Sequence, residues 1–312
     1  MNYNILVTGG AGYLGSTMVP ELLAKGHKVT VVDNFMWDQN SLAHACHHPN
    51  FDVVRGDVRI EQTMLPLIKK ADIIIPLAAY VGAPLCARDP VGASTTNHDA
   101  IISMLKHVSK HQRILMPTTN SAYGSCDQNN FCDEESPLNP ISLYAIEKVK
   151  VEQALMQHPN ATSFRLATVF GMSPRMRIDL LVNDFTYRAL HDRFVVLFES
   201  NFKRNYIHVR DIARAFLHGI DNYEKTNGQI FNVGLSEANV SKKELCEHIK
   251  KQLPDFTFID APVGKDPDQR NYIVSNAKIE ATGYKPQVSL DAGITELIKG
   301  FSMIRNTKYG NV

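Results

Sequence analysis

The sequence predicts an α/β protein with a doubly wound parallel sheet and a second, smaller α/β lobe. Strand-like and helix-like segments alternate through the first half of the chain, which is typical of a parallel sheet covered by helices on both faces. A glycine-rich turn joins the first strand-like segment to the first helical one, as in a βαβ unit. With 312 residues, the chain can bury a large core and still build a smaller lobe or second domain.

A strand, a tight turn and a helix open the chain. From Ile5 the sequence reads Ile-Leu-Val-Thr-Gly-Gly-Ala-Gly-Tyr-Leu-Gly, so the apolar run stops at Thr8. A helical pattern follows from Ser16 to Lys25, and Gly26 stands where a helix C-cap belongs.

Each glycine of this turn has its own expected task. Gly9 and Gly10 permit backbone torsions that a Cβ atom would forbid. Gly12 lets the main chain approach a ligand, and Gly15 lets the new helix pack against the strand. The free N–H groups and positive end of the helix then suit a pyrophosphate. The turn therefore predicts a bound dinucleotide.

The second strand, Lys28 to Val32, ends at Asp33. A carboxylate at this position accepts hydrogen bonds from the hydroxyls of the adenosine ribose. It would also repel a 2′-phosphate, and residues 34 to 41 contain no Arg or Lys that could bind one. NAD is therefore expected in preference to NADP.

Two further strand ends face the same expected ligand. Asp57 follows the strand Phe51 to Val54 and either reaches an adenine ring or caps the helix that begins at Ile60. The apolar strand from Asp72 ends in Leu77-Ala78-Ala79, whose small neutral side chains suit close passage of a dinucleotide. A helix containing Asn97 and the strand Arg113 to Pro117 come next.

The segment after this strand carries the expected chemistry. Thr119 lies at the carboxyl edge of the sheet, where open α/β sheets bind ligands. Tyr144 and Lys148 stand four residues apart at the start of a long helix and so share one face. A phenol has a pKa near ~10, but an ammonium about 4 Å away at an effective dielectric of ~20 favours the phenolate by up to ~4 kcal/mol. Such a tyrosinate is a suitable base for a sugar hydroxyl.

With these motifs in order, the chain resembles an extended short-chain dehydrogenase/reductase of the nucleotide-sugar epimerase/dehydratase kind, with a Rossmann domain. The similarity covers nearly the whole length. Its landmarks here are Gly9, Gly12, Gly15, Asp33, Gly56-Asp57, Leu77-Ala78-Ala79, Asn97, Thr119, Tyr144, Lys148, Arg165, residues 204–211 (Arg-Asn-Tyr-Ile-His-Val-Arg-Asp) and residues 231–234 (Phe-Asn-Val-Gly).

The resemblance implies a role for each of three catalytic residues. Tyr144 would take the proton from a sugar hydroxyl while the carbon loses hydride to the nicotinamide. Thr119 would hydrogen-bond that hydroxyl, and Lys148 would hold the nicotinamide ribose and lower the pKa of Tyr144. The residues expected to contact NAD are Gly9, Gly12, Tyr13, Leu14, Asp33, Asn34, Asp57, Val58, Leu77, Ala78, Ala79, Asn97, Tyr144 and Lys148.

The sequence departs from the family pattern at informative positions. In the 4,6-dehydratases of this family, Asp and Glu follow the catalytic Ser or Thr, where this chain has Asn120 and Ser121. Neither can act as the acid or base of a dehydration at neutral pH. Pro76 replaces a His, and Thr168 replaces an Asn that contacts phosphate.

The second half of the chain is expected to build the substrate lobe. The strand Ala161 to Ala167 leads to an irregular segment at 171–177, then a helix from Asp179 to Arg193. We expect His208 to be a structural hydrogen-bonding residue. The expected contacts to the nucleotide sugar are Asn120, Ser121, Thr168, Arg175, Arg177, Asn183, Arg204 and Arg270.

The chain then returns to the first domain before completing the lobe. The cofactor domain gains a helix from Val209 to Tyr223 and a strand from Gln229 to Val233. The lobe then gains helices from Lys242 to Gln252 and from Leu290 to Ile304, the second of them capped by Ser289. We therefore expect an NAD-binding domain of residues 1–170, to which 203–234 return. The nucleotide-sugar lobe comprises 171–202 and 235–312.

Composition excludes several classes of protein. The net charge is +1 with acids and bases interspersed, so no nucleic-acid or membrane partner is expected. The five cysteines form no CxxC pair, which predicts reduced thiols and no metal site. The N-terminus enters the first strand without a signal-peptide pattern, and no apolar run reaches the ~18 residues of a membrane span. We expect a cytoplasmic protein that forms a homodimer, as the resemblance implies.

The sequence thus predicts an NAD-dependent enzyme that oxidises C4 of a nucleotide-linked sugar. Return of hydride to the opposite face gives epimerisation, and release of the keto sugar gives net dehydrogenation. Residues 34–39 and 80–86 resemble a branch acting on GDP-linked manno-heptose in bacterial surface-polysaccharide synthesis. A 4,6-dehydratase and a catalytically inactive NAD-binding scaffold are the alternatives.

Overall fold

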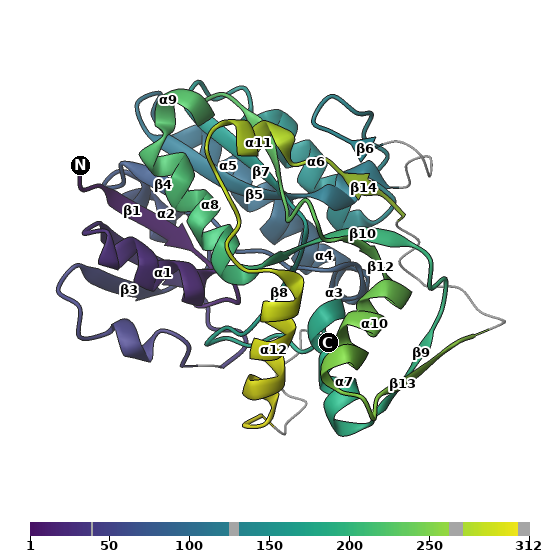
Figure 1. Ribbon diagram of the computed structural model, residues 1–312. Coiled ribbons are helices and arrows are strands. Elements are labelled where there is room, and N and C mark those ends of the chain that lie inside the picture. Colours follow the sequence, from purple (N-terminus) through teal and green to yellow (C-terminus); the bar gives the residue numbers. More distant parts are fainter. Residues whose placement is uncertain (39, 125–130, 262–270, 305–312) are drawn as a thin grey trace.

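A computed structural model describes the chain except for residues 39, 125–130, 262–270 and 305–312 (Figure 1). Its centre is a seven-stranded sheet in the order β11-β7-β5-β4-β1-β2-β3, with every neighbouring pair parallel. The predicted doubly wound parallel sheet is confirmed. Its strands are β1 (Asn4–Thr8), β2 (Lys28–Asp33), β3 (Phe51–Arg55), β4 (Ile73–Pro76), β5 (Arg113–Thr119), β7 (Ala161–Leu166) and β11 (Ile230–Val233).

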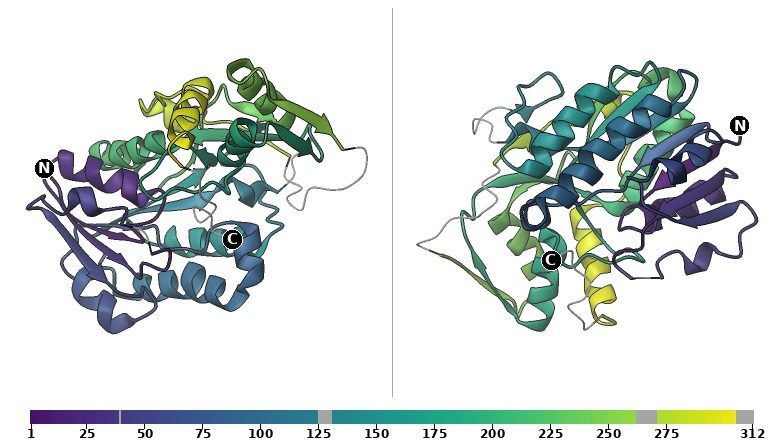
Figure 2. Two further views of the ribbon diagram at one scale, coloured as in Figure 1. Left: turned by 90° about the horizontal axis from the view of Figure 1, so that it is seen from below. Right: turned by 180° about the vertical axis from the view of Figure 1, so that it is seen from behind.

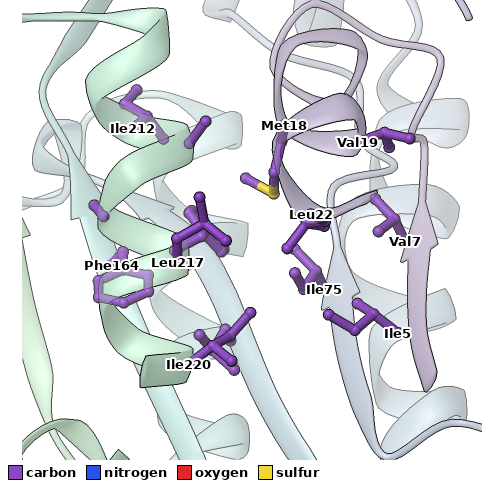
Figure 3. Packing of buried hydrophobic residues seen from close by; sticks show 14 of the residues in the cluster. Ile5, Val7, Met18, Val19, Leu22, Ile75, Phe164, Ile212, Leu217 and Ile220 are labelled. Atoms are coloured by element: carbon purple, nitrogen blue, oxygen red, sulfur yellow. The ribbon is translucent and has the colours of Figure 1, made fainter. Parts of the chain in front are cut away.

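Helices cover both faces of this sheet, as the side views in Figure 2 show. On one face lie α1 (Gly15–Ala24) and α8 (Val209–Asp221), and on the other α2 (Glu61–Ile68), α5 (Ala100–His107) and α6 (Leu143–Leu155). Successive residues of a strand face opposite layers. Ile5 and Val7 of β1 pack beneath α1 (Figure 3), whereas Leu6 packs on the α2 side. This burial on both faces explains why the central strands β1 and β4 are mainly apolar.

The strand order reverses between β1 and β4, which opens a crevice beyond their carboxyl ends. Gly9 turns the chain there with a φ of +66°, and a Cβ atom on it would lie 2.5 Å from the Ala78 backbone. A Cβ on Gly15 would lie 2.5 Å from the carbonyl oxygen of Gly10. Glycine is therefore required where the turn, α1 and the end of β4 meet.

A second hydrophobic cluster lies beyond the sheet, around α7 (Leu181–His191), α10 (Lys242–Gln252) and α12 (Leu290–Phe301). Three small sheets accompany it. Their strands are β8 (Thr168–Phe170), β10 (Lys203–His208) and β12 (Asn239–Ser241); β9 (Phe194–Leu197) and β13 (Thr257–Asp260); and β6 (Phe131–Cys132) and β14 (Ile273–Val274). The shorter helices are α3 (Ala83–Arg88), α4 (Pro90–Ser94), α9 (Tyr223–Thr226) and α11 (Ala277–Ala281), with single turns at Ala43–Ala45, Thr95–Asp99 and Asn120–Tyr123.

The chain returns to the first unit through α8 and β11. Leu217 and Ile220 of α8 share a buried cluster with Met18 and Leu22 of α1 (Figure 3). Strand β11 extends the central sheet by pairing with β7. The expected domain boundaries themselves stay a prediction.

Several local predictions can be compared with the structure. Ser289 caps α12, since its side chain accepts a hydrogen bond from the Ala292 N–H, and Gly26 has a φ of +86° after α1. Asp57 does not cap the next helix, because its carboxylate binds the N–H and guanidinium of Arg59.

The prediction of reduced cysteines is wrong at one position. Cys132 is disulfide-bonded, whereas Cys46, Cys86 and Cys246 are free thiols. Among the described residues, no His, Cys, Asp and Glu side chains gather into a group able to hold a metal ion. Within the same ranges, no helix has the length and apolar character needed to cross a membrane.

Candidate active site

A pocket of about 300 Å³ opens at the carboxyl ends of the central strands. It runs from the end of β2, past the glycine turn and the end of β4, to the end of β5 and the start of α6. The predicted site residues that line it are Gly9, Gly12, Tyr13, Leu14, Asp33, Asn34, Asp57, Val58, Leu77, Ala78, Ala79, Thr119, Ser121, Tyr144, Lys148, Thr168, Arg175 and Arg177.

One end of the pocket holds the hydroxyl and amine groups expected to do chemistry. Thr119 is the last residue of β5, and its Oγ1 accepts from the Ser121 N–H at 3.1 Å and donates to Ser121 Oγ at 3.0 Å. Tyr144 and Lys148 approach from the first turns of α6, which Ser142 caps by accepting from the Ala145 N–H. Strand end and helix start therefore present three polar side chains to one space.

Lys148 is buried, with 4% of its surface exposed. Its Nζ donates to the Pro117 carbonyl oxygen at 3.3 Å. Burial lowers the pKa of Lys148 to about 8, while the nearby Cys86 and Glu147 act in the opposite direction. The ammonium is still the main form at pH 7, so it remains able to favour a phenolate.

A buried network fixes α6 against β7 and against β5, the strand that ends in Thr119. The Glu152 carboxylate, on α6, accepts from the Arg165 guanidinium at 2.7 Å and from the hydroxyls of Thr118 and Ser163 at 2.9 and 2.7 Å. Arg165 also donates to the Tyr123 hydroxyl at 2.9 Å. Arg165 therefore holds the framework together and does not face the pocket.

The opposite end of the pocket fits the adenosine half of a dinucleotide. Asp33 is partly buried, and its two oxygens accept from the N–H groups of Ala11 and Phe35 at 3.0 and 2.8 Å. Burial raises the pKa of Asp33, and these two hydrogen bonds oppose that change. A Cβ on Gly12 would meet only the Gly9 carbonyl oxygen, so the turn leaves open space for a ligand. The first turn of α1 carries no acidic residue, so its positive end suits a phosphate.

Two predicted ligands belong instead to the framework around the pocket. The Asn97 amide holds the main chain of Tyr80, accepting from its N–H at 2.8 Å and donating to its carbonyl at 3.0 Å. Asn183 binds the Gly171 N–H, the Arg177 carbonyl and the Tyr13 hydroxyl. Both amides are buried outside the pocket lining, and their partners position loops that do line it.

The remaining predicted residues lie elsewhere. Asn120 and Arg204 are buried and do not line the pocket, and Arg270 lies outside the described residues. His208 caps α8 by accepting from the Arg210 N–H, and it contacts Glu296 at 3.4 Å. His208 therefore makes the kind of hydrogen bond expected of a structural residue, and it does not line the pocket.

Sequence analysis missed part of the lining. The missed residues include Met36 and Trp37 after β2, residues 80–83 after β4, Thr96, Ser142 and Leu180. Met36, Trp37 and residues 80–83 directly follow predicted strands, and this position at strand ends is the signal that could have identified them. Leu180 carries no such signal, because it lies in the segment that enters α7.

Comparison with known proteins bears on this arrangement. Residues 5–234 match the model of the NAD dependent epimerase/dehydratase family. A UDP-N-acetyl-alpha-D-glucosaminuronate decarboxylase of Bacillus cytotoxicus is 27% identical over 98% of this chain and 100% of its own length. UDP-glucuronic acid decarboxylase 1 of Arabidopsis thaliana is 26% identical over 95% of this chain and 69% of its own. A crystal structure of Thermotoga maritima UDP-glucose 4-epimerase with UDP-glucose superposes with a TM-score of 0.83, at 26% identity over 96% of this chain and 99% of the epimerase.

Proposed function

Because the chain belongs to the NAD-dependent epimerase/dehydratase family, we propose that it oxidises C4 of a nucleotide-linked sugar, as a 4-epimerase or a net 4-dehydrogenase. The observation that carries this proposal is the pairing of two features in one pocket. Thr119, Tyr144 and Lys148 line one end, and Asp33 and the glycine turn line the other. A cofactor bound along this pocket would have its adenosine beside Asp33 and its reactive ring beside Tyr144.

In this proposal each side chain has a defined role. When bound, NAD would supply the oxidising chemistry, as a hydride acceptor for the sugar carbon. Tyr144 removes the hydroxyl proton, because its phenolate is a suitable base once a neighbouring ammonium stabilises it. Lys148 supplies that ammonium and holds the nicotinamide ribose. Thr119 orients the reacting hydroxyl, and its bond to Ser121 Oγ fixes the direction of its own proton.

Dehydration is less compatible with the site. Removal of water from C5 and C6 needs an acid for the leaving hydroxyl and a base for the C5 proton. Ser121 lines the pocket but is neutral at pH 7, and Asn120 is fully buried outside the lining. We therefore rank a 4,6-dehydratase below oxidation at C4. We also rank an inactive scaffold lower, because the chain retains Thr119, Tyr144 and Lys148.

Decarboxylation is a second candidate, favoured by the names of the two sequence relatives. Oxidation at C4 of a nucleotide-linked uronic acid gives a β-keto acid, whose loss of CO₂ leaves an enolate. That enolate takes up a proton at C5, and return of the hydride to C4 would restore NAD. Such a substrate needs a cation for its carboxylate. Arg177 lines the pocket and is nearly buried in a pair with Asp179, so it is the residue we assign to that task.

We also propose a homodimer that pairs through α5 and α6. These helices pack side by side on one face of the sheet (Figure 2). They carry three half-buried apolar side chains, Ile102, Ile146 and Val149, that belong to none of the hydrophobic clusters among the described residues. Light scattering during size-exclusion chromatography tests this proposal, and a mass of one chain would contradict it.

Product analysis tests the proposed reaction. The purified protein is incubated with NAD and, separately, with GDP-manno-heptose and UDP-, dTDP-, CDP- and GDP-hexoses and uronic acids. Epimerisation gives a product of unchanged mass and altered proton NMR couplings, and dehydrogenation gives stoichiometric NADH. Loss of water or of CO₂ would instead support the dehydratase or the decarboxylase. No product from any sugar, with NAD bound, would support the scaffold.

A further inference from the structure

Two side chains from distant parts of the sequence meet beside Asp33. Trp37, the single tryptophan of the chain, lies in the loop after β2, and Arg175 lies in the segment between β8 and α7. The Arg175 guanidinium carbon is 4.7 Å from the centroid of the Trp37 ring, a distance typical of a cation–π contact. Trp37 and Arg175, which we call the adenosine clamp, both line the pocket next to Asp33.

The loop that carries Trp37 is held in an unusual conformation. Phe35 and Asp38, on either side of it, have φ angles of +56° and +49°. Residues other than glycine rarely adopt this conformation, which persists where the surrounding structure imposes it. Here the Asp33 carboxylate accepts from the Phe35 N–H, and the Arg55 guanidinium lies 5.0 Å from the centre of the Phe35 ring. The loop that carries the indole is therefore held, two residues before Trp37, by the same carboxylate that is expected to bind the ribose.

The segment that carries Arg175 is fixed to the glycine turn. Ser173 Oγ donates to the Tyr13 carbonyl at 2.7 Å, and the Arg175 N–H donates to Ser16 Oγ at 3.2 Å. The Tyr13 hydroxyl donates to the Gly171 carbonyl at 2.6 Å. Only 2% of the Arg175 surface is exposed. The guanidinium is thus a built part of the cofactor end of the pocket.

The clamp also encloses a small space next to Asp33. A cavity of about 20 Å³ lies between the clamp, Asp33 and the glycine turn. That volume holds one water molecule and is too small for a phosphate group. Burial lowers the pKa of Arg175 to about 10, and the attraction of Asp33 opposes that change. At pH 7 the guanidinium therefore stays charged and balances the Asp33 carboxylate.

We propose that the adenosine clamp closes over the ribose held by Asp33 and so retains NAD between turnovers. This inference rests on the proposed function. A reaction that oxidises and then reduces the same sugar is served by a cofactor that does not dissociate. The segment that bears Arg175 continues to Arg177 and Leu180, which line the pocket further along. One stretch of chain thus contributes three residues to the lining of the pocket.

The rate of NADH release tests the clamp without any sugar. Because Trp37 is the single indole, energy transfer from it to bound NADH reports occupancy of this site alone. Release is timed by mixing the NADH complex with excess NAD in a stopped-flow instrument. We expect Trp37→Ala and Arg175→Met each to release NADH at least tenfold faster than the unaltered protein, which corresponds to about 1.4 kcal/mol. Because Trp37→Ala has no indole, its release is measured by the fluorescence of NADH itself. Trp37→Phe keeps an aromatic ring and should stay within about threefold of the unaltered protein.

Two further variants separate stacking from charge and from general damage. Arg175→Lys keeps a positive charge but loses the planar group, so we expect it to release NADH as fast as Arg175→Met. Recovery of slow release by Lys would overturn the stacking interpretation. Arg188→Met removes an exposed arginine that pairs with Asp184 on α7, and it should not change the rate.

The outcomes for the clamp and for the proposed function are distinct. Thermal melting shows which clamp variants are folded. If folded variants release NADH within twofold of the normal rate, the clamp proposal is overturned, even if the protein turns over the sugar. Slow release in the unaltered protein and fast release in the variants would support the clamp even if no sugar reacts. If Trp37→Ala does not fold, the Arg175 variants decide the result.

Discussion

We predict that Lys148→Met stabilises the cofactor-free protein while abolishing its activity. The pKa of this buried lysine falls from 10.5 to about 8 on folding. At ~1.36 kcal/mol per pKa unit, that difference makes the buried ammonium unfavourable by about 3 kcal/mol at pH 7. The hydrogen bond from Nζ to the Pro117 carbonyl offsets about 1 kcal/mol of this. Methionine fills similar space without a charge, so we expect a net gain of about 2 kcal/mol.

The pH dependence of this gain has a definite sign. Below pH 8 the lysine is charged in both the folded and the unfolded protein, and the cost of burying it is present in full. Between pH 8 and about 10.5 the folded state loses its proton first, so the stability of the unaltered protein rises with pH relative to the variant. Above about 10.5 both states are neutral and the cost vanishes. The advantage of Lys148→Met should therefore shrink as the pH rises from 8.

Urea denaturation of dinucleotide-free protein at pH 7 and pH 9.5 measures both effects. Lys150→Met, on the same helix but exposed, is the matched control and should leave the free energy of unfolding unchanged. Turnover of the sugar by Lys148→Met should fall at least ~100-fold. A loss of stability at pH 7, or a gain that does not depend on pH, would refute the reasoning that burial is the dominant cause of the lowered pKa of this lysine.

Three other predictions concern the same pocket and its support. Tyr144→Phe should lower turnover at least ~100-fold while NADH still binds; fluorescence titration and product assays check this, and activity within tenfold would remove Tyr144 from the mechanism. Asp33→Ala should weaken the binding of NAD and reduce the preference for NAD over NADP, measured as the ratio of the two dissociation constants. An unchanged ratio would show that Asp33 does not select the cofactor. Glu152→Ala should cost ~3–5 kcal/mol of unfolding free energy by leaving Arg165 buried without its partner. The double variant Glu152→Met/Arg165→Met should lose less than the two single changes combined, and additive losses would contradict the ion-pair interpretation.

The sheet and its order were predictable because each strand ends in a local signal. The glycine turn, Asp33 and the small residues after β4 all mark carboxyl ends of strands that the fold brings to one edge. Element ends were harder to predict. The apolar run through Ala79 predicts a longer strand than the observed β4, which ends at Pro76 because the chain then passes against Gly9. Strand β5 runs on to Thr119 because β7 pairs with it that far, a contact between segments that periodicity does not reveal.

Within the site, predictability followed the distance between partners. Tyr144 and Lys148 lie one helical turn apart, so their shared face was evident from spacing. The roles of Asn97 and Asn183 were not, because each amide binds the main chain of a loop that folding brings to it. Arg175 meets Trp37 only in the folded chain, and no local pattern in either segment announces the contact. Cys132 likewise gave no signal of a disulfide, since the chain has an odd number of cysteines and no CxxC pair.

The packing of α8 on α1 has a consequence for biosynthesis. The side chains of Met18, Leu22 and Phe164 are covered by a helix that begins only at Val209 (Figure 3), and the sheet gains its last strand at residues 230–233. A nascent chain that has emerged from the ribosome up to residue 170 would expose this hydrophobic surface to solvent for several seconds of translation. Premature termination or a protease cut ahead of α8 should therefore yield an aggregating fragment, and the N-terminal half should depend on chaperones until the later helix emerges.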